Sequence, residues 1–554
     1  MMSRRAPPPA AVLFAVLVLA ALLCHGLLLW APPIFDDEAF VFANTKVTGP
    51  WPGLGAFFGG TFGNGEYEPL MTLLHWGLHH LFGAAVFPYR ATSLLFHWAV
   101  VFLFWRLARR FLDEAMALAV AALFAVFPAH IEVIALTSFK KHIAVACFGL
   151  GLMNVQQEER LSRLQRAVPG AVLLGLGLLC KESAVIFAPL AAAAAAARGG
   201  FRGLREERVF LGSLLGVCAA YALLRLAILP RTLMPLMGGG WLTHGLTCGK
   251  ILLWHLGQLV LPASLALEHS LGVVRGTAEA ALVVLGVLSW GALGIFLWRK
   301  DRIAAFGWMW VSLALLPFLN IIPFLNFSLV ANRYDYMAGA GFLLLVGRLS
   351  QGALRARLPG GGRRVLLAAV LPFGFYALLG MRYAVLFSSP FDLWSDSARS
   401  APEHPRVHAA LGGLYASWHD LVAAERELRR SIALSPALPE PYVPLAWLLA
   451  ETGRGPEALR LARWRLTLRP DALAWGSLGQ ILAREGRFAE ALPFLEKFKE
   501  MRPGPYAELA LAQCLLALGE PDRAEKALRA VRDDPQLEAK ALRGLGDVEL
   551  VRGH

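Results

Sequence analysis

The sequence lacks three patterns that would assign it to a common soluble class. Its six cysteines show neither the paired spacing of a disulfide framework nor the spacing of a zinc site. Its formal net charge of +13 comes from basic residues in short loops, without the basic stripe of a nucleic-acid interface. These absences exclude a disulfide-rich module and a zinc finger, and they argue against a nucleic-acid partner.

Apolar residues, by contrast, are abundant. They make up 57% of the chain, whereas soluble domains have about 45–50%. The excess is confined to residues 10–388, and the remainder is charged, with apolar residues at helical spacing. We therefore predict an all-α chain with a polytopic membrane domain over residues 1–388. A linker at 389–404 is expected to join it to a soluble helical domain at 405–554.

The lengths of the apolar runs and the arginine-rich loops predict about eleven spans, with the N-terminus in the cytoplasm. The first span covers Ala10–Trp30, and residues 31–88 follow as a long external loop. One helix is expected over residues 132–154. Residues 168–197 are too long for one span, so two short helices are expected to meet at an external Lys181-Glu182.

Trp241 and His244 are predicted to lie in an external loop, and residues 250–262 along the outer surface. This count places polar residues from distant segments at one external face: Asp36, Asp37, His130, Glu132, Lys181, Glu182 and Arg333. The predicted location is the bacterial inner membrane, with residues 31–88 and the C-terminal domain on the periplasmic side.

The C-terminal part contains a repeat. Alanines recur at Ala424, Ala458, Ala491 and Ala524, each with small and apolar residues at fixed offsets before it and a proline after it. A period of about 34 residues with this pattern is typical of tetratricopeptide repeats, in which small residues let paired helices approach closely. We predict an α-solenoid of about four and a half repeats.

Acids and cations at the outer face of a membrane bundle suit sugar transfer from a polyprenyl phosphate. Asp36 or Asp37 would be the base that accepts the proton of an acceptor hydroxyl. Lys181 and Arg333 would bind the donor phosphate. The lipid tail would lie among the helices, so the partners are a polyprenyl-phosphate-linked sugar and membrane lipid.

Several motifs resemble the transmembrane-and-tetratricopeptide-repeat O-mannosyltransferases, a family of multi-pass, lipid-phospho-sugar-dependent glycosyltransferases. They are Asp36-Asp37 with Asn44, Tyr67-Glu68-Pro69-Leu70, Phe96-His97, Pro128-Ala129-His130-Ile131-Glu132-Val133, Cys180-Lys181-Glu182 and Asn332-Arg333-Tyr334-Asp335-Tyr336. The resemblance implies a dolichol- or undecaprenyl-phosphate donor, with mannose as the sugar, and a catalytic acidic pair in the first external loop. His130, Glu132, Glu182 and Tyr334 would be supporting residues. The chain departs from the usual family pattern at Glu68, Asn332 and Lys140-Lys141.

Other interpretations of the same residues stay open. Asp36 and Asp37 can be interface acids, His130 and Glu132 a structural pair, and Lys181-Glu182 an ion pair at a helix turn. Arg333 can anchor a lipid headgroup, and we expect Lys140 and Lys141 to do so. No metal is assigned, although a divalent cation beside Asp36 and Asp37 is left open.

For the whole chain, the alternative function is a non-enzymatic membrane scaffold whose repeats recruit proteins. A transporter is the third class, disfavoured because its charged groups would lie at the midplane rather than at one face. In the enzyme hypothesis, the repeats bind the polypeptide acceptor or a protein that delivers it.

Overall fold

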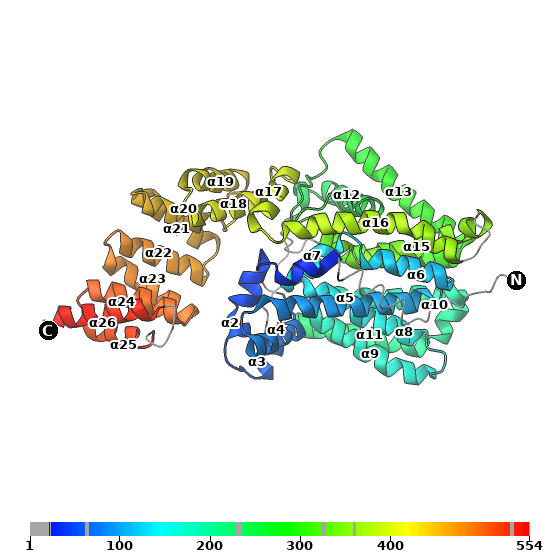
Figure 1. Cartoon of the computed structure of the whole chain (residues 1–554), viewed down its shortest axis with the longest axis horizontal. Coiled ribbons are helices and arrows are strands. Elements are labelled where there is room, and N and C mark those ends of the chain that lie inside the picture. The colour runs from blue at the N-terminus through cyan, green and yellow to red at the C-terminus, as the bar shows by residue number, and fades with distance from the viewer. Residues whose placement is uncertain are drawn as a thin grey trace. The chain divides into compact units, whose positions relative to one another are not determined.

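The computed structural model describes residues 22, 24–60, 66–228, 235–262, 264–322, 328–357, 362–531 and 537–552. Helices are the regular secondary structure throughout these segments, and none of them contains a strand. The chain divides into two compact units, Met1–Leu393 and Trp394–His554 (Figure 1). The predicted all-α class is therefore confirmed. Most of the first expected span, Ala10–Trp30, lies outside the described residues.

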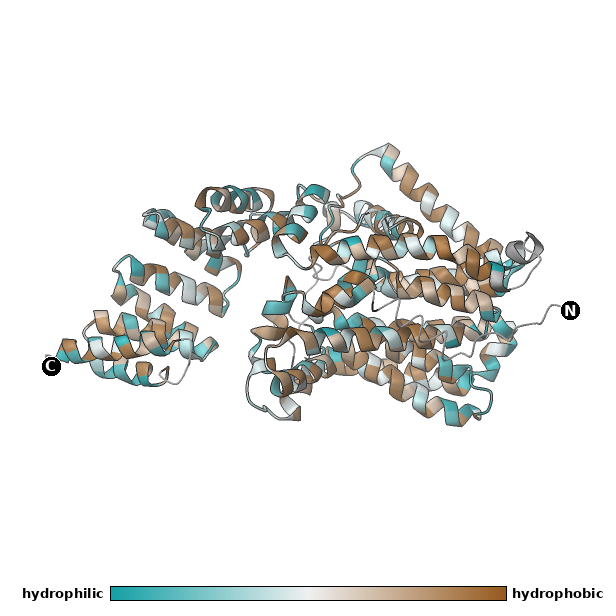
Figure 2. Ribbon diagram, in the orientation of Figure 1, coloured by the Kyte–Doolittle hydropathy of each residue, from teal (hydrophilic) through white to brown (hydrophobic). Residues whose placement is uncertain are grey.

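Long apolar helices dominate the first unit, and much of their ribbon is brown, the colour of hydrophobic residues, in Figure 2. In the described segments, six are long and apolar enough to cross a bilayer: Val86–Ala108 (α5), Arg163–Cys180 (α9), Glu182–Glu206, Arg208–Ile228 (α11), Thr277–Lys300 (α13) and Arg364–Leu386. Glu114–Ala125 (α6) and Arg302–Phe318 are shorter apolar helices. The membrane character is confirmed, but the count of eleven spans is not.

The break predicted at Lys181-Glu182 is present. Helix α9 ends at Cys180, and Lys181 adopts an extended backbone with φ −167° and ψ 141°. A short 3₁₀ turn, η4 (Glu182–Ile186), then leads into α10 (Phe187–Glu206). The extended residue redirects the chain, so the apolar stretch forms two helices as expected.

Two other expectations are wrong. Residues 132–154 do not form one helix but a short α7 (His130–Ala135), a 3₁₀ turn η3 (Thr137–Phe139) and α8 (Lys140–Gln156). Helix α7 ends before Leu136, whose backbone is extended with φ −100° and ψ 115°, and the backbone N–H of Ser138 beyond it donates to the Asp37 carboxylate.

Trp241 and His244 do not lie in a loop, and residues 250–262 are not a separate surface segment. Trp241–Val260 is a single helix, α12. The polar residues that interrupt its apolar run are accommodated by hydrogen bonds. Thr247 Oγ1 donates to Thr243 O, and a ring nitrogen of His244 lies 3.3 Å from Ile321 O.

Close packing of α14 (Arg302–Leu315) against α15 (Asp335–Arg357) positions the turn that contains Arg333. A Cβ on Gly341 would lie 2.7 Å from Cβ of Trp310. The backbone of α15 at Gly341 therefore packs directly against the Trp310 side chain of α14. The 3₁₀ turn η7 (Asn332–Tyr334) directly precedes α15. Arg333 is thus held at the end of a rigid helix pair.

The second unit forms helix pairs, as the repeat period predicts. The pairs are α18/α19 (Pro405–Ser417, Leu421–Leu434), α20/α21 (Tyr442–Glu451, Gly455–Leu468), α22/α23 (Ala472–Arg484, Phe488–Met501) and α24/α25 (Pro505–Ala517, Pro521–Arg529), followed by α26 (Glu538–Arg552). The four period alanines are fully buried. A Cβ on Gly412 would lie 2.5 Å from Leu428, so the small residue permits the predicted close approach.

The segment expected to link the two domains is largely helical, as α17 (Pro390–Ser400). The prolines expected to follow the second helix of each repeat do so at Pro436, Pro470 and Pro503. The fourth, Pro535, lies outside the described residues.

Candidate active site

The segment Thr137–His142, called here the α8 junction, connects the polar residues of the membrane unit. It comprises η3 and the first residues of α8. Its successive residues contact different partners: Ser138 binds Asp37, Phe139 lies beneath Arg333, and Lys141 pairs with two glutamates. Residues far apart in sequence therefore meet around one short turn.

Asp37 is fully buried and has two firm partners. Its Oδ2 lies 3.0 Å from Arg90 Nη2 on α5, and its Oδ1 accepts the Ser138 N–H at 2.8 Å. Arg90 also donates to Pro32 O at 3.2 Å. Asp36 is different because its side chain is only partly buried. The two aspartates are thus unequal, with Asp37 locked in the interior and Asp36 nearer the surface.

The chain reaches the two aspartates through a strained turn. Phe35 has φ 61°, in the left-handed region that side chains with a Cβ adopt only at a cost. Its ring lies 5.9 Å, centroid to centroid, from that of Phe139 in the α8 junction. The turn is therefore held in place from both sides, by this ring contact and by the Asp37 ion pair.

Arg333 forms a buried ion pair with Glu132 of α7. Its side chain and its backbone N–H both donate to the Glu132 carboxylate. Its guanidinium lies 4.5 Å from the ring centroid of Phe139 and 5.0 Å from that of Tyr334. Burial raises the pKa of Glu132 to about 7, although the charge of Arg333 acts in the opposite direction.

Lys141 and Lys181 share a second carboxylate pair. Lys141 Nζ donates to both Glu66 and Glu68, and Lys181 Nζ lies 3.8 Å from Glu66 Oε1. Burial would raise the pKa of Glu66, but the two lysine charges hold it well below its usual range. Burial raises the pKa of Glu68 well above its usual range. Glu182 does not join this group, since it pairs with Arg225 on α11 at 3.1 Å.

His130 lies among aromatic rings. Its ring centroid is 4.4 Å from those of Phe124 and Tyr336 and 5.6 Å from that of His97. Tyr336 is fixed in turn by a 2.8 Å hydrogen bond between its hydroxyl and His97 Nδ1. His130 therefore packs in the interior next to Glu132, where its ring supports α7.

Tyr334 lies closer to the charged residues. Its ring stacks on Phe318 at 4.3 Å, and both line a small cavity with His142, Ser183 and Arg333. His142 interacts electrostatically with three cations, Lys141, Lys181 and Arg333. The structure thus brings Arg333, Tyr334 and the turn after Lys181 to the same place, and their roles in donor binding stay a prediction. Each of the two predicted phosphate ligands, Lys181 and Arg333, already has a carboxylate partner.

Several buried charges were missed from the sequence. Lys140 and Lys141 were expected at lipid headgroups, but Lys140 is 0% exposed and Lys141 6%. The buried Arg90 and Glu68, and the partly exposed Glu66, were not assigned either. A usable signal was the Lys-Lys-His run at the start of an otherwise apolar helix, because uncompensated charges there would be costly.

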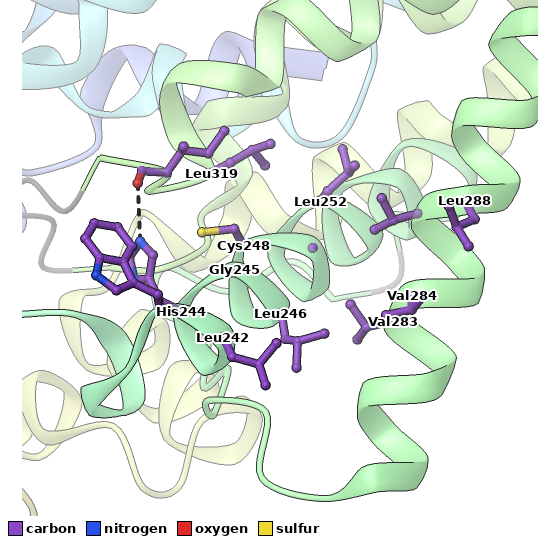
Figure 3. Close-up of a pocket in the computed structure, with 14 residues that line it drawn as sticks. Leu242, His244, Gly245, Leu246, Cys248, Leu252, Val283, Val284, Leu288 and Leu319 are labelled. Atoms are coloured by element: carbon purple, nitrogen blue, oxygen red, sulfur yellow. Dashed lines mark hydrogen bonds between the residues drawn. The ribbon is translucent and has the colours of Figure 1, made fainter.

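An open apolar pocket of about 600 Å³ lies between α12 and α13 (Figure 3). Leu242, Leu246 and Cys248 of α12 face Val283 and Leu288 of α13 across it, together with Leu319 and Ile321 from the segment after α14. The few polar groups of its wall include the His244 ring, which is already bonded to Ile321 O. Its lining suits a hydrocarbon chain.

Within the segments that the structure describes, no group of three His, Cys, Asp or Glu side chains is arranged for a metal ion. The polar chemistry there rests on carboxylates, lysines and arginines.

Comparison with known proteins defines the class. Residues 67–224 match the family described as dolichyl-phosphate-mannose-protein mannosyltransferase. Residues 443–507 and 482–545 match tetratricopeptide repeats. The chain thus combines a mannosyltransferase-type membrane domain with tetratricopeptide repeats, which confirms the resemblance found in the sequence.

Two curated relatives are protein O-mannosyl-transferases. One, from Caenorhabditis elegans, is 22% identical over 333 residues, which cover 56% of this chain and 47% of the relative. Tmtc2 of Drosophila melanogaster is 31% identical over 221 residues, covering 36% and 23%. The chain therefore spans less than half the length of either relative.

Among solved structures, the chain aligns with the Archaeoglobus fulgidus oligosaccharyltransferase. The TM-score is 0.37 at 13% identity, and the alignment covers 76% of this chain and 59% of that one. A TM-score of this size does not establish a shared fold.

Proposed function

We propose that this protein is an integral-membrane glycosyltransferase. It would transfer a sugar, mannose by analogy with the names of its relatives, from a polyprenyl phosphate to a polypeptide hydroxyl. One observation carries the proposal. The segment that matches the mannosyltransferase family supplies Glu68, Arg90, Glu132, Lys141 and Lys181 to the charged residues around the α8 junction. Buried charges in a membrane protein are costly and concentrate where they have a function.

In the proposed reaction, the acceptor oxygen attacks C1 of the sugar, and the bond from C1 to the phosphate oxygen breaks. Polyprenyl phosphate leaves with the electron pair, and the acceptor proton passes to a carboxylate base. The leaving phosphate gains negative charge, which the buried cations around the α8 junction stabilise at short range. The low dielectric of the interior strengthens this effect.

Asp36 is the better candidate for the base. A base must reach the acceptor hydroxyl, and the Asp36 side chain is only partly buried. Both oxygens of Asp37 are engaged, by Ser138 and Arg90, in the interior. Asp37 is therefore assigned a positioning role, in which it fixes the turn that presents Asp36.

The apolar pocket between α12 and α13 is proposed to hold the polyprenyl chain. The short segment after α14 connects it to the charged residues. Phe318 lines the small cavity with Arg333 and Tyr334, whereas Leu319 and Ile321 line the apolar pocket. Asn320, which lies between Leu319 and Ile321, has φ 57°, and this conformation turns the chain there. A phosphate at the charged residues would thus have an apolar channel for its tail close by.

The acceptor and the membrane face follow from sequence reasoning. With the predicted eleven spans and the positive-inside rule, the charged residues and the repeats would lie on the external face of the membrane, the periplasmic side in a bacterium. Tetratricopeptide repeats bind extended or helical segments in their concave groove. The repeats would therefore hold the polypeptide acceptor, or a protein that delivers it.

Reconstitution tests the proposal. Full-length protein in proteoliposomes receives a polyprenyl phosphate with a radiolabelled mannose and a mixture of unfolded polypeptides. Label that becomes protein-bound only with the active protein is the expected result. The scaffold alternative predicts that polypeptides bind but acquire no label.

A further inference from the structure

Lys140 differs from the other buried cations around the α8 junction. Lys141, Lys181, Arg90 and Arg333 each have a carboxylate oxygen within 4 Å. Lys140 is completely buried, and its Nζ has no hydrogen-bond or ion-pair partner in the segments that the structure describes. A buried ammonium without an anion is strongly unfavourable, so its retention calls for an explanation.

The charged groups around Lys140 supply no anion that it does not have to share. Arg90 and Asp37 are the charged side chains that act on it, and the ring centroid of Tyr89 lies 5.8 Å from its Nζ. Asp37 is already paired with Arg90. The Nε and Nη1 atoms of Arg90 have no partner in the described segments either. Two buried cations therefore share one carboxylate and leave several N–H donors unused.

We propose that Lys140 and Arg90 together bind the phosphate group of the donor lipid directly. A phosphate oxyanion supplies the missing negative charge and accepts the unused N–H donors. The first turn of α8 begins at Lys140, so its positive end favours the same anion. Lys181 and Arg333, held by Glu66 and Glu132, then position the neighbouring groups rather than contact the phosphate. This inference rests on the proposed function for the identity of the lipid.

The site is closed in this structure, since Arg90, Lys140 and Asp37 are all buried. The turn before Asp37 is the element that admits the ligand. It bonds to Arg90 through Pro32 O and Asp37, and Phe35 stores strain within it. A phosphate bound by Nε and Nη1 of Arg90 leaves the Nη2 contacts to Pro32 O and Asp37 in place, so the turn that presents Asp36 is fixed again once the ligand is bound.

The test measures ligand-free stability and lipid binding in the same variants. Lys140→Met keeps the length of the side chain and removes its charge. We expect a higher Tm for the ligand-free protein, and about tenfold to hundredfold weaker binding of polyprenyl phosphate. Binding of the neutral polyprenol should not change. Lys140→Arg should restore most of the phosphate-dependent affinity. Lys141→Met is the matched control and should lower the Tm, because it leaves the buried Glu68 without its ion-pair partner.

Inorganic phosphate and phosphatidic acid, measured on the same variants, separate the phosphate group from its lipid carrier. Dependence of polyprenyl phosphate binding on Lys140, with the effect on phosphatidic acid smaller, supports the proposal. Equal affinity of wild type and Lys140→Met for polyprenyl phosphate overturns this inference but leaves the proposed function intact. Failure of the wild type to bind polyprenyl phosphate at all overturns both.

Discussion

The Asp37 carboxylate and the Arg90 guanidinium approach to 3.0 Å in the membrane unit, and neither side chain reaches solvent. Asp37 lies on the first loop and Arg90 on α5, so the pair fastens that loop to a long apolar helix. The residue before Asp37, Asp36, is only partly buried. Adjacent aspartates with such different surroundings should respond differently to the same substitution.

Asp37→Asn should destabilise the protein by about 3–5 kcal/mol, because it leaves Arg90 as an uncompensated buried charge. Asp36→Asn should cost about 1 kcal/mol or less. Denaturant or thermal unfolding of both variants in the same detergent measures the difference. Equal stabilities would contradict the positioning role of Asp37.

The raised pKa of Glu132 makes a pH prediction. Between the ordinary glutamate pKa of about 4.3 and the folded value of about 7, the folded state retains a proton that the unfolded state releases. Stability therefore falls as pH rises through this window, by up to about 4 kcal/mol.

Glu132→Gln removes the titrating group with little change of shape. The Tm of the wild type should fall between pH 5 and pH 8 by more than the Tm of this variant. Parallel pH profiles for the two proteins would show that Glu132 does not titrate in this range.

The apolar pocket can be filled without disturbing its walls. A Cβ at Gly245, which lines the pocket, would contact no heavy atom within 4 Å. Gly245→Phe should therefore place a ring in the pocket and raise the KM for a long-chain donor about tenfold or more, since several methylene contacts are lost. A short-chain donor analogue should be much less affected.

Gly257→Phe is the control for this experiment. Gly257 lies on the same helix α12, also has open space at its Cβ, and is not part of the pocket lining. Kinetics with long- and short-chain donors should match the wild type for this variant. An equal loss from both substitutions would indicate a general effect on α12.

The repeats should govern the choice of acceptor rather than the chemistry. Deletion of residues 401–554 should preserve transfer to a small hydroxyl surrogate and abolish transfer to the natural polypeptide. Assays with both acceptors, on protein with a wild-type Tm for the membrane unit, measure this. Unchanged transfer to the polypeptide would exclude acceptor binding by the repeats.

The sequence predicts best what local pattern determines. The repeat period identifies the solenoid because Ala424 and its equivalents must be small wherever two helices touch. The break at Lys181 is also predictable, since a charged pair cannot remain in the middle of an apolar span.

The burial of Lys140 and Lys141 was not predictable in this way. Lys141 can be buried only because Glu66 and Glu68, from a distant segment, supply its charge partners. The same holds for the turn before α8, where the Ser138 N–H donates to the Asp37 carboxylate. Length and hydropathy carry no information about such pairs. From these two properties alone, a charged helix start is predicted to lie at the membrane surface.

Single-turnover transfer by wild type and Asp36→Asn in proteoliposomes tests the central claim most directly. Both proteins are loaded with a polyprenyl phosphate that carries radiolabelled mannose, and label on the acceptor and release of polyprenyl phosphate are followed together. The account predicts equal lipid loading and a transfer rate lower in the variant by about 10²–10⁴-fold. A variant that transfers the sugar at the wild-type rate would contradict it.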